Sequence, residues 1–478
     1  MKIPAASIRE NLTLLSKIFL IICISFKIIF SVFAYLDPVT NELKFSGSFK
    51  KLINNDENDL ASRSYNLIHG KGFVKTIVNH DTLTYKLSSN RPLLNIAIHY
   101  LYQKIYVHFY PLSETDIIGP NNKLDKTIPY YVMYSKALNY IALLFFLISI
   151  PYFFHLLKSL GIKNKTIQNF TTGAYLVFPS TLIYIGCVPL YENICLPISI
   201  IGISFLLKLL SGESKNTFFT FLGCSFMLTI SMMLRPQVLT PTVFTLMAFG
   251  IFVIIKTKKE GFKANKYIWK FIAIFSVVFI MLQSCVFIVN YKYFKQIFYT
   301  NRGDAFMWGH YDLAKGSWDG TVDLKGTVGY NYERKIIPGY DDMTEIEQNN
   351  AQNKIGKEWI KNNLDKEIKL TFKKLAILFM PYNFENLVFN FPMFIIHIGL
   401  FLFLIFFIFN FNTLRKNPAV VFILVWIFGI VFVNLMFFVE YRVKYFADPY
   451  MLILTAFLIN YLFEKYTAKQ LNNTYNKP

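Results

Sequence analysis

Three acidic residues stand close together near the start of the chain: Asp56, Glu57 and Asp59. On a helix, Asp56 and Asp59 would share a face, because residues three apart are neighbours on the helix surface. Carboxylates in this arrangement could act as a general base on an acceptor hydroxyl or amine, or hold a divalent cation. A structural role is the alternative, since acids favour the first turn of a helix, here with Asn54 or Asn55 as its N-cap.

A basic group follows the acids in the same polar stretch. The helix that carries the acids is expected to end at the Gly70-Lys71-Gly72 turn, and Tyr85, Lys86 and Arg91 come after it. Arginine forks phosphate oxygens and lysine supplies a point charge, so these residues could bind a phosphate near the headgroup plane. Ordinary contact with lipid headgroups by long side chains is the alternative.

Three more ionisable residues stand at the ends of apolar runs. They are Glu192 in PLYENICLP, Arg235 in MLRPQVLTP and Arg442 in VEYRVKYFADP. Ionisable groups at membrane depth are costly and tend to mark a site, although each one alone could face solvent or headgroups. We expect all three at the same membrane face as the acids.

The composition indicates which kind of structure holds these residues in place. Of 478 residues, 54% are hydrophobic and only 16% are charged, whereas a soluble domain carries about a quarter charged residues. The apolar residues cluster in runs of about 20, which is the length of a membrane-spanning helix. The fold class predicted is therefore an all-α polytopic membrane protein. The net charge of +20 is attributed to cytoplasmic loops, and no nucleic-acid-binding motif accompanies it.

About ten spans are expected. They lie near Leu14–Tyr35, Pro129–Leu157, Gln168–Gly186, Pro189–Leu210, Thr217–Leu234, Val238–Ile255, Tyr267–Tyr291, Val388–Phe411, Pro418–Phe438 and Pro449–Tyr461. The organisation predicted is an N-terminus with the first span (1–35), a first polar block (36–128), a bundle (129–291), a second polar block (292–387), and C-terminal spans with a tail (388–478).

Basic clusters set the predicted orientation. Lys158, Lys208, Lys256 and Arg415 each stand among neighbouring lysines in short loops, which the positive-inside rule places in the cytoplasm. Both polar blocks then face outward. The chain is outside at Arg91 and inside at Lys158, so an odd number of spans must lie between them, although two apolar segments are present. The segment from Arg91 is the more polar of the two, and it is therefore expected to lie on the outer membrane surface. Its apolar face would enter the lipid, with its His, Gln and Lys residues in the interface.

The first polar block resembles the first external loop of GT-C superfamily glycosyltransferases. The branch is the bacterial one related to the aminoarabinose transferase of lipid A and to protein O-mannosyltransferases. The resemblance rests on D-x-x-D followed by Tyr65, Leu67 and GKGF, and then RPLL. Further short matches follow in order, at Tyr191-Glu192-Asn193, Leu234-Arg235-Pro236, GSWDG and EYRVKYFADPY. The sequence departs from the family where it has Arg91-Pro92-Leu93 in place of R-P-P, and it ends soon after its last span.

The resemblance implies an inverting transfer from a polyprenyl-phosphate sugar, undecaprenyl phosphate in a bacterium, to an envelope acceptor. It implies a multi-pass protein of the plasma (inner) membrane with its active site on the outer face. Asp56 would be the base, assisted by Glu57 or Asp59. The donor would be bound by residues among Tyr85, Lys86, Arg91, Glu192, Arg235 and Arg442. Some members of the superfamily use a divalent metal, but no ligand set stands out here, and no cofactor is assigned.

Two other functions remain open. An envelope polysaccharide polymerase or ligase also has many spans and a large external loop. A lipid-linked sugar transporter or flippase would show internal repeats and charges at mid-membrane depth, and no clear repeat is present. His310, near Asp304 and Asp312, is expected on an ordinary loop surface, with acceptor binding as the alternative.

Overall fold

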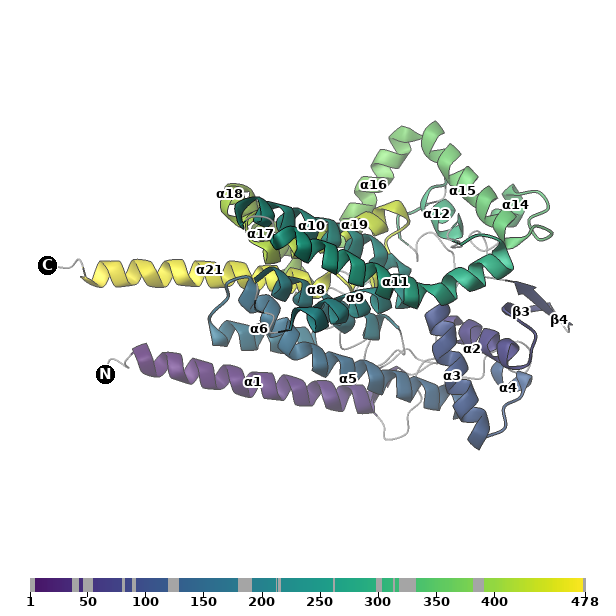
Figure 1. The fold of residues 1–478 in the computed structure, drawn as a ribbon, viewed down its shortest axis with the longest axis horizontal. Helices are drawn as coiled ribbons and strands as arrows, with labels where there is room; N and C mark the ends of the chain where they lie inside the picture. Colours follow the sequence, from purple (N-terminus) through teal and green to yellow (C-terminus); the bar gives the residue numbers. More distant parts are fainter. Residues whose placement is uncertain are drawn as a thin grey trace.

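The computed structural model describes residues 5–36, 43–45, 55–79, 82–87, 92–118, 129–178, 191–211, 213, 216–260, 263–297, 303–312, 314–317, 332–380 and 391–475. The protein is a polytopic helical bundle with polar elements gathered at one end (Figure 1). The long helices are α1 (Ala5–Phe33), α5 (Pro129–Ser159), α6 (Lys165–Val177), α8 (Glu192–Ser211), α9 (Thr217–Leu234), α10 (Leu239–Glu260), α11 (Lys263–Phe294), α17 (Phe391–Phe409), α19 (Pro418–Met436) and α21 (Asp448–Tyr475).

Eight helices of the described part of the chain are long and apolar enough to cross a membrane. They coincide with eight of the expected spans: Glu10–Phe33, Met133–Ser159, Glu192–Ser211, Thr217–Leu234, Pro236–Lys258, Trp269–Phe294, Phe391–Phe409 and Pro418–Met436. Of the other two, Gln168–Gly186 is helical in α6 and its second half lies outside the described residues, while Pro449–Tyr461 falls within the longer α21. Such helices form because a bilayer offers the backbone no hydrogen-bond partners.

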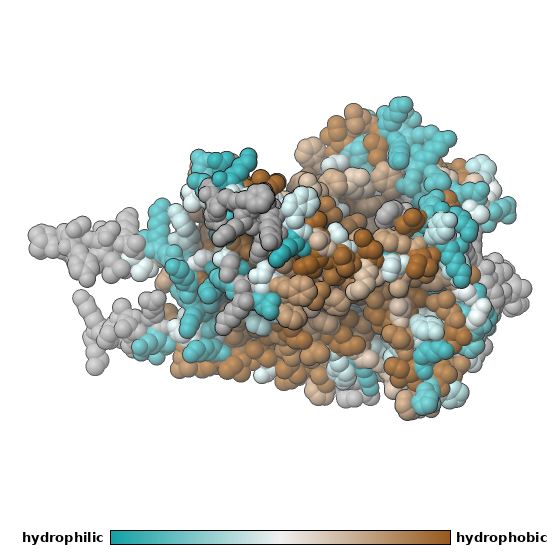
Figure 2. Space-filling view, in the orientation of Figure 1, coloured by the Kyte–Doolittle hydropathy of each residue, from teal (hydrophilic) through white to brown (hydrophobic). Residues whose placement is uncertain are grey.

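Both polar blocks lie at the same end of the bundle. α1 begins and α21 ends at the opposite end (Figure 1). The first polar block holds α2 (Asn55–Ile68), α3 (Leu93–Phe109) and α4 (Glu114–Ile118), and the second holds α12 (Gly303–Gly309), α14 (Tyr332–Ile336), α15 (Glu345–Asn362) and α16 (Leu364–Phe379). Figure 2 shows the corresponding apolar surface along the bundle, with hydrophilic side chains toward the two ends.

Helix α8 is the centre of the bundle. Every residue from Tyr191 to Ser204 is buried, and the helix packs between α5 and α9. At Gly202 a Cβ would stand 2.7 Å from the end of the Leu228 side chain, so glycine lets α8 approach α9 here without moving that side chain. Close contact at small residues is how helices associate in lipid, where apolar burial gives little driving force.

Two short hairpins correct the expectation of a purely helical chain. β1 (Ala34–Leu36) pairs antiparallel with β2 (Leu43–Phe45), and β3 (Val74–Asn79) pairs antiparallel with β4 (Thr82–Leu87). The stretches VKTIVN and TLTYKL are rich in β-branched residues, which was the available signal. The hairpins leave the class of the bundle unchanged, since both belong to the polar end.

The shared end of the two blocks predicts the outcome of a labelling experiment. A cysteine replacing Lys354 on α15, whose side chain is 75% exposed, should react with a membrane-impermeant maleimide in intact cells. A cysteine replacing Glu213, 53% exposed in the α8–α9 connection at the opposite end, should react only after lysis. Reaction of both from the same side would contradict the arrangement, and the reverse pattern would invert the orientation.

Candidate active site

Helix α2 carries the acidic residues at its beginning. It starts at Asn55, so Asp56 and Glu57 are its second and third residues, and their side chains lie outside what the structure describes. Asp59 is described: its carboxylate accepts hydrogen bonds from Arg63 Nε at 2.9 Å and from Arg63 Nη2 at 3.2 Å. The Arg63 side chain is fully buried and that of Asp59 is 21% exposed. A carboxylate engaged by a buried guanidinium is less available to take a proton, so Asp59 is better suited to a structural role.

The end of α2 follows the expected turn. Gly70 and Gly72 have φ of +72° and +85°, which glycine adopts without strain, and Lys71 N donates to Asn66 O at 2.8 Å. Asn66 Nδ2 then donates to Val74 O at 3.0 Å, which ties the helix to the hairpin β3–β4. Tyr85 and Lys86 are in β4, opposite Thr76 and Lys75 in register, with side chains outside the description, and Arg91 lies outside the described residues.

Helix α3 corrects the expected placement of two of its polar residues, while Lys104 and His108 are exposed as expected. His99 and Gln103 were expected in the water-facing interface, yet both are fully buried. Gln103 Nε2 donates to Ala61 O of α2 at 2.8 Å, and the His99 ring stacks on Tyr134 of α5 with centroids 3.9 Å apart. The exposed side carries large apolar side chains at Leu101, Ile105 and Phe109, together with Lys104 and His108. The two inward polar groups find partners on neighbouring helices, and the mixed exposed side suits the membrane interface.

The same helix connects the acidic helix to the bundle. Ser64 Oγ of α2 donates to Ile96 O of α3 at 3.1 Å. Asn95, one residue before Ile96, has its Nδ2 3.4 Å from Leu234 O at the end of α9, and its own carbonyl accepts from Tyr191 Oη at 3.2 Å. α3 thus holds α2 against the bundle ends where Glu192 and Arg235 stand.

Glu192 and Arg235, both expected in the site, form an ion pair in the structure. Their side chains are 4% and 16% exposed, so the pair is nearly out of solvent. Arg235 is also the C-cap residue of α9, its amide donating to Ser231 O at 3.0 Å. Glu192 Oε2 and Arg235 Nε have no hydrogen-bond partner among the described residues. The pair is electrically neutral as a unit, so Arg235 offers less charge to a phosphate than a lone guanidinium would.

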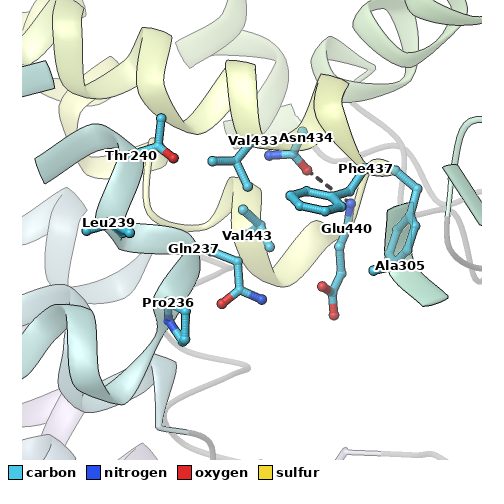
Figure 3. Close-up of a pocket in the computed structure, with 11 residues that line it drawn as sticks. Pro236, Gln237, Leu239, Thr240, Ala305, Val433, Asn434, Phe437, Glu440 and Val443 are labelled. Carbon is cyan, nitrogen blue, oxygen red and sulfur yellow. Dashed lines mark hydrogen bonds between the residues drawn. The ribbon is translucent and has the colours of Figure 1, made fainter. Parts of the chain in front are cut away.

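A pocket of about 240 Å³ begins beside this pair. Its walls come from the turn after α9, including η2 (Pro236–Val238), from the end of α19 and the segment after it, and from α12. Apolar side chains dominate the lining, with polar groups at Gln237, Thr240, Asn434 and Glu440. In Figure 3 the side chains of Gln237 and Glu440 extend toward the same opening. An apolar pocket with a few directed polar groups is the usual form of a small-molecule site.

The segment after α19 forms the wall that contains Arg442. Asn434 Oδ1 accepts from Glu440 N at 3.1 Å, which fixes the start of this segment (Figure 3). Arg442 is in the short helix α20 (Tyr441–Lys444), between the lining residues Glu440 and Val443, and its side chain lies outside the description. Burial lowers the pKa of Lys444 to about 8, an effect that the Asp448 carboxylate opposes.

The second polar block is attached to the end of α19, next to the pocket. Lys374 Nζ of α16 donates to Leu435 O at 3.0 Å, and His310 Nε2 lies 2.9 Å from Met436 O. His310 Nδ1 lies 2.9 Å from Glu367 Oε2. His310 is therefore a buried residue that joins the block to the bundle, which corrects its expected place on a loop surface. Burial lowers the pKa of Lys374 to about 8, and the Glu367 carboxylate opposes the shift.

The described residues contain no cluster of three His, Cys, Asp or Glu side chains that could hold a metal ion. The polar groups that line the pocket are amides, a hydroxyl and one carboxylate, which suit hydrogen bonding to hydroxyl-rich ligands.

Neither a protein-family model nor a curated protein matches this sequence.

Sequence reasoning did not find Gln237, Asn434, Lys374 or the role of His310. Gln237 could have been found, since it follows the Arg235-Pro236 turn at the expected membrane face. Asn434 stands inside an apolar span, and an amide there signals an interhelical or capping contact. Lys374 and His310 gave no separate signal, because only the packing of α16 and α12 onto α19 buries them.

The Asp59–Arg63 pair predicts that replacing Asp59 lowers stability more than replacing Asp56. Asp59→Asn should lower the melting temperature in detergent, because it removes the negative charge that the buried Arg63 guanidinium contacts, at a cost of about 3 kcal/mol. Asp56→Asn, at the start of the same helix, is the matched variant and should melt like the wild type. Equal melting of all three proteins would contradict the structural role of Asp59.

The buried Lys374 predicts a pH dependence of stability. Its pKa of about 8 in the fold lies below the unfolded value of about 10.4, so the unfolded chain binds more protons between these limits. Stability should therefore rise across that range, by at most about 1.4 kcal/mol per pH unit from this group. The melting temperature of the wild type minus that of Lys374→Met should increase from pH 7.5 to pH 10. A difference that stays constant or falls would show that Lys374 is not a buried cation.

Proposed function

We propose that this protein is a membrane glycosyltransferase that moves a sugar from a polyprenyl-phosphate donor to an envelope acceptor. The observation that supports it most is the position of the pocket. It lies at the polar end of the bundle, between the turn after Arg235 and the segment that contains Arg442. A lipid-linked donor needs such a place, where its tail can remain among the spans while its phosphate and sugar reach the polar blocks.

The lining of the pocket fits the parts of the donor. Gln237, Thr240 and Asn434 can hydrogen-bond sugar hydroxyls, and the apolar walls can contact the less polar faces of the ring. We assign the departing phosphate to Arg442, with Lys86 and Arg91 as further candidates from the first polar block. Arg235 has a smaller share, because Glu192 already neutralises it. The proposed role of Arg235 is to fix the turn that begins the pocket.

The proposed reaction is a single inverting displacement. An acceptor hydroxyl or amine attacks the anomeric carbon, the bond from that carbon to the phosphate oxygen breaks, and the acceptor proton passes to Asp56. Cations near the phosphate stabilise the negative charge that develops on it. Helix α3 supports this scheme, because it connects the helix of Asp56 to the end of α9 beside the pocket.

The test is transfer by the purified protein from radiolabelled polyprenyl-phosphate sugars to an envelope extract. Asp56→Asn should reduce transfer by about 10²-fold or more, the usual contribution of a general base, with donor binding kept. Arg442→Ala should weaken donor binding, and Lys354→Gln, at an exposed position of α15, should leave both transfer and donor binding unchanged.

Three results would count against the proposal. Full transfer by Asp56→Asn would remove the assigned base. Unchanged donor binding by Arg442→Ala would remove the assigned phosphate contact. A folded wild type that neither binds nor transfers any of the donors, but moves lipid-linked sugars across liposomes, would show a transporter instead.

A further inference from the structure

Helix α16 has three distinct faces. One is buried against the rest of the protein and contains Leu370, Lys374, Ile377 and Leu378. With 100° between successive residues, these positions occupy one side of the helix. The remaining surface carries an apolar stripe and a basic stripe, with the exposed acid Asp365 between them.

The apolar stripe consists of Leu364, Ile368 and Phe372, which follow one another at intervals of four residues. Their side chains are 61%, 50% and 68% exposed, although each is large and hydrophobic. Residues four apart lie one above the other on a helix, so the three form a continuous strip. Water is a poor environment for such a strip, and no described element covers it.

The basic stripe lies beside the apolar one. Lys366, Lys369 and Lys373 are exposed and fall within one sector of the helix, about 60° wide at 100° per residue. Lys366 Nζ lies 3.6 Å from Asp312, an exposed pair of little energetic weight. The nearby acid Glu367 points inward to His310, and the exposed Asp365 offsets one of the three positive charges, so the stripe remains basic.

The attachment of α16 fixes its depth relative to the membrane. Lys374 binds the carbonyl of Leu435, in the last turn of a membrane-spanning helix. From Lys374 to Leu364 the helix rises about 15 Å at 1.5 Å per residue. In Figure 1, α16 runs obliquely outward from the end of the bundle, so part of this length is sideways. At the tip formed with α15, apolar and hydrophilic side chains lie next to each other (Figure 2).

We propose that α16 is an interfacial helix that binds anionic lipid headgroups in the leaflet on the side of the two polar blocks. Leu364, Ile368 and Phe372 enter the upper part of that leaflet, and Lys366, Lys369 and Lys373 contact its phosphates. A basic stripe beside an apolar stripe, at the level where the acyl chains end, matches the two components of such a surface. This assignment is independent of the proposed transfer reaction.

Lipid binding by α16 would act on the pocket. The helix joins α12 through Glu367 and His310, and Ala305 of α12 lines the pocket. A headgroup layer that holds α16 therefore also holds one pocket wall against the end of α19.

The experiment uses the full-length protein in nanodiscs of phosphatidylcholine, alone or mixed with phosphatidylglycerol. An environment-sensitive nitrobenzoxadiazole label is attached to Phe372→Cys, with Lys354→Cys on α15 as the matched position and labelled wild type as the background for native thiols. In discs with phosphatidylglycerol, the label at position 372 should emit at shorter wavelength and be quenched by lipids that carry a nitroxide high on the acyl chain. The label at position 354 should emit as in water.

Charge variants test the lysines separately. Lys366→Gln, Lys369→Gln and Lys373→Gln combined should lower the ratio of inserted to free label by about fivefold for each lysine removed. The matched triple variant Lys335→Gln, Lys354→Gln and Lys357→Gln should leave that ratio unchanged.

Three outcomes would overturn the assignment. Water-like emission from position 372 in both kinds of disc would show that the stripe does not enter lipid. Equal insertion with and without phosphatidylglycerol would remove the role of the lysines. A wavelength shift that appears only in discs holding two copies would identify a second copy of the chain as the occupant.

Discussion

The polar end of this protein depends on the contacts that are made to the last carbonyls of helix α19. A helix terminus leaves its final carbonyls without intrahelical partners, and beside a bilayer this cost is higher than in water. Here Lys374 and His310, both from the second polar block, supply donors to Leu435 and Met436. The positive charge of lysine also suits the negative end of the helix dipole. These two contacts therefore satisfy carbonyls at the end of a span, and they also hold the second polar block in position.

This placement explains why the pocket is where it is. The chain turns at Phe437 directly after the capped carbonyls, and a Cβ at Gly309 of α12 would collide with the carbonyl of Phe437. α12 therefore approaches the turn as closely as a glycine allows, which brings Ala305 to the pocket. The opposite wall is held by the turn after α9, which the Glu192–Arg235 pair connects to α8. The pocket therefore lies between the end of α9 and the end of α19, and charged side chains hold both of these helix ends in place.

Much of the fold could be predicted from sequence, because runs of about twenty apolar residues leave few alternatives. The expected limits of Pro418–Phe438 and Thr217–Leu234 agree with α19 and α9 to within two residues. The turn at Gly70 and Gly72 could also be predicted, because few residues other than glycine adopt the positive φ that such a turn needs.

The site could be predicted only in part. Arg235 and Glu192 were recognised as charged residues at span ends, but their pairing depends on how α8 and α9 are packed, which no local pattern reports. His99 and Gln103 were assigned to the wrong face for a related reason. The sequence does not show whether a polar residue of a segment such as α3 is exposed, as Lys104 and His108 are, or meets protein, as His99 and Gln103 do. For α2, acids at these positions suit both a helix start and a catalytic base. Only for Asp59 does the structure favour one of these roles, because its carboxylate is bonded to Arg63.

The inward polar face of α3 constrains how the protein is made. While the chain is being synthesised, α3 leaves the ribosome well before the helices that hold its partners: α8 begins about a hundred residues later and α9 later still. Until Tyr191 and the end of α9 arrive, Asn95 lacks the contacts seen in the folded protein. The first polar block therefore completes its structure only after about half of the bundle has been inserted. A nascent chain stalled before α9 would hold its acidic helix without the support that places it beside the pocket.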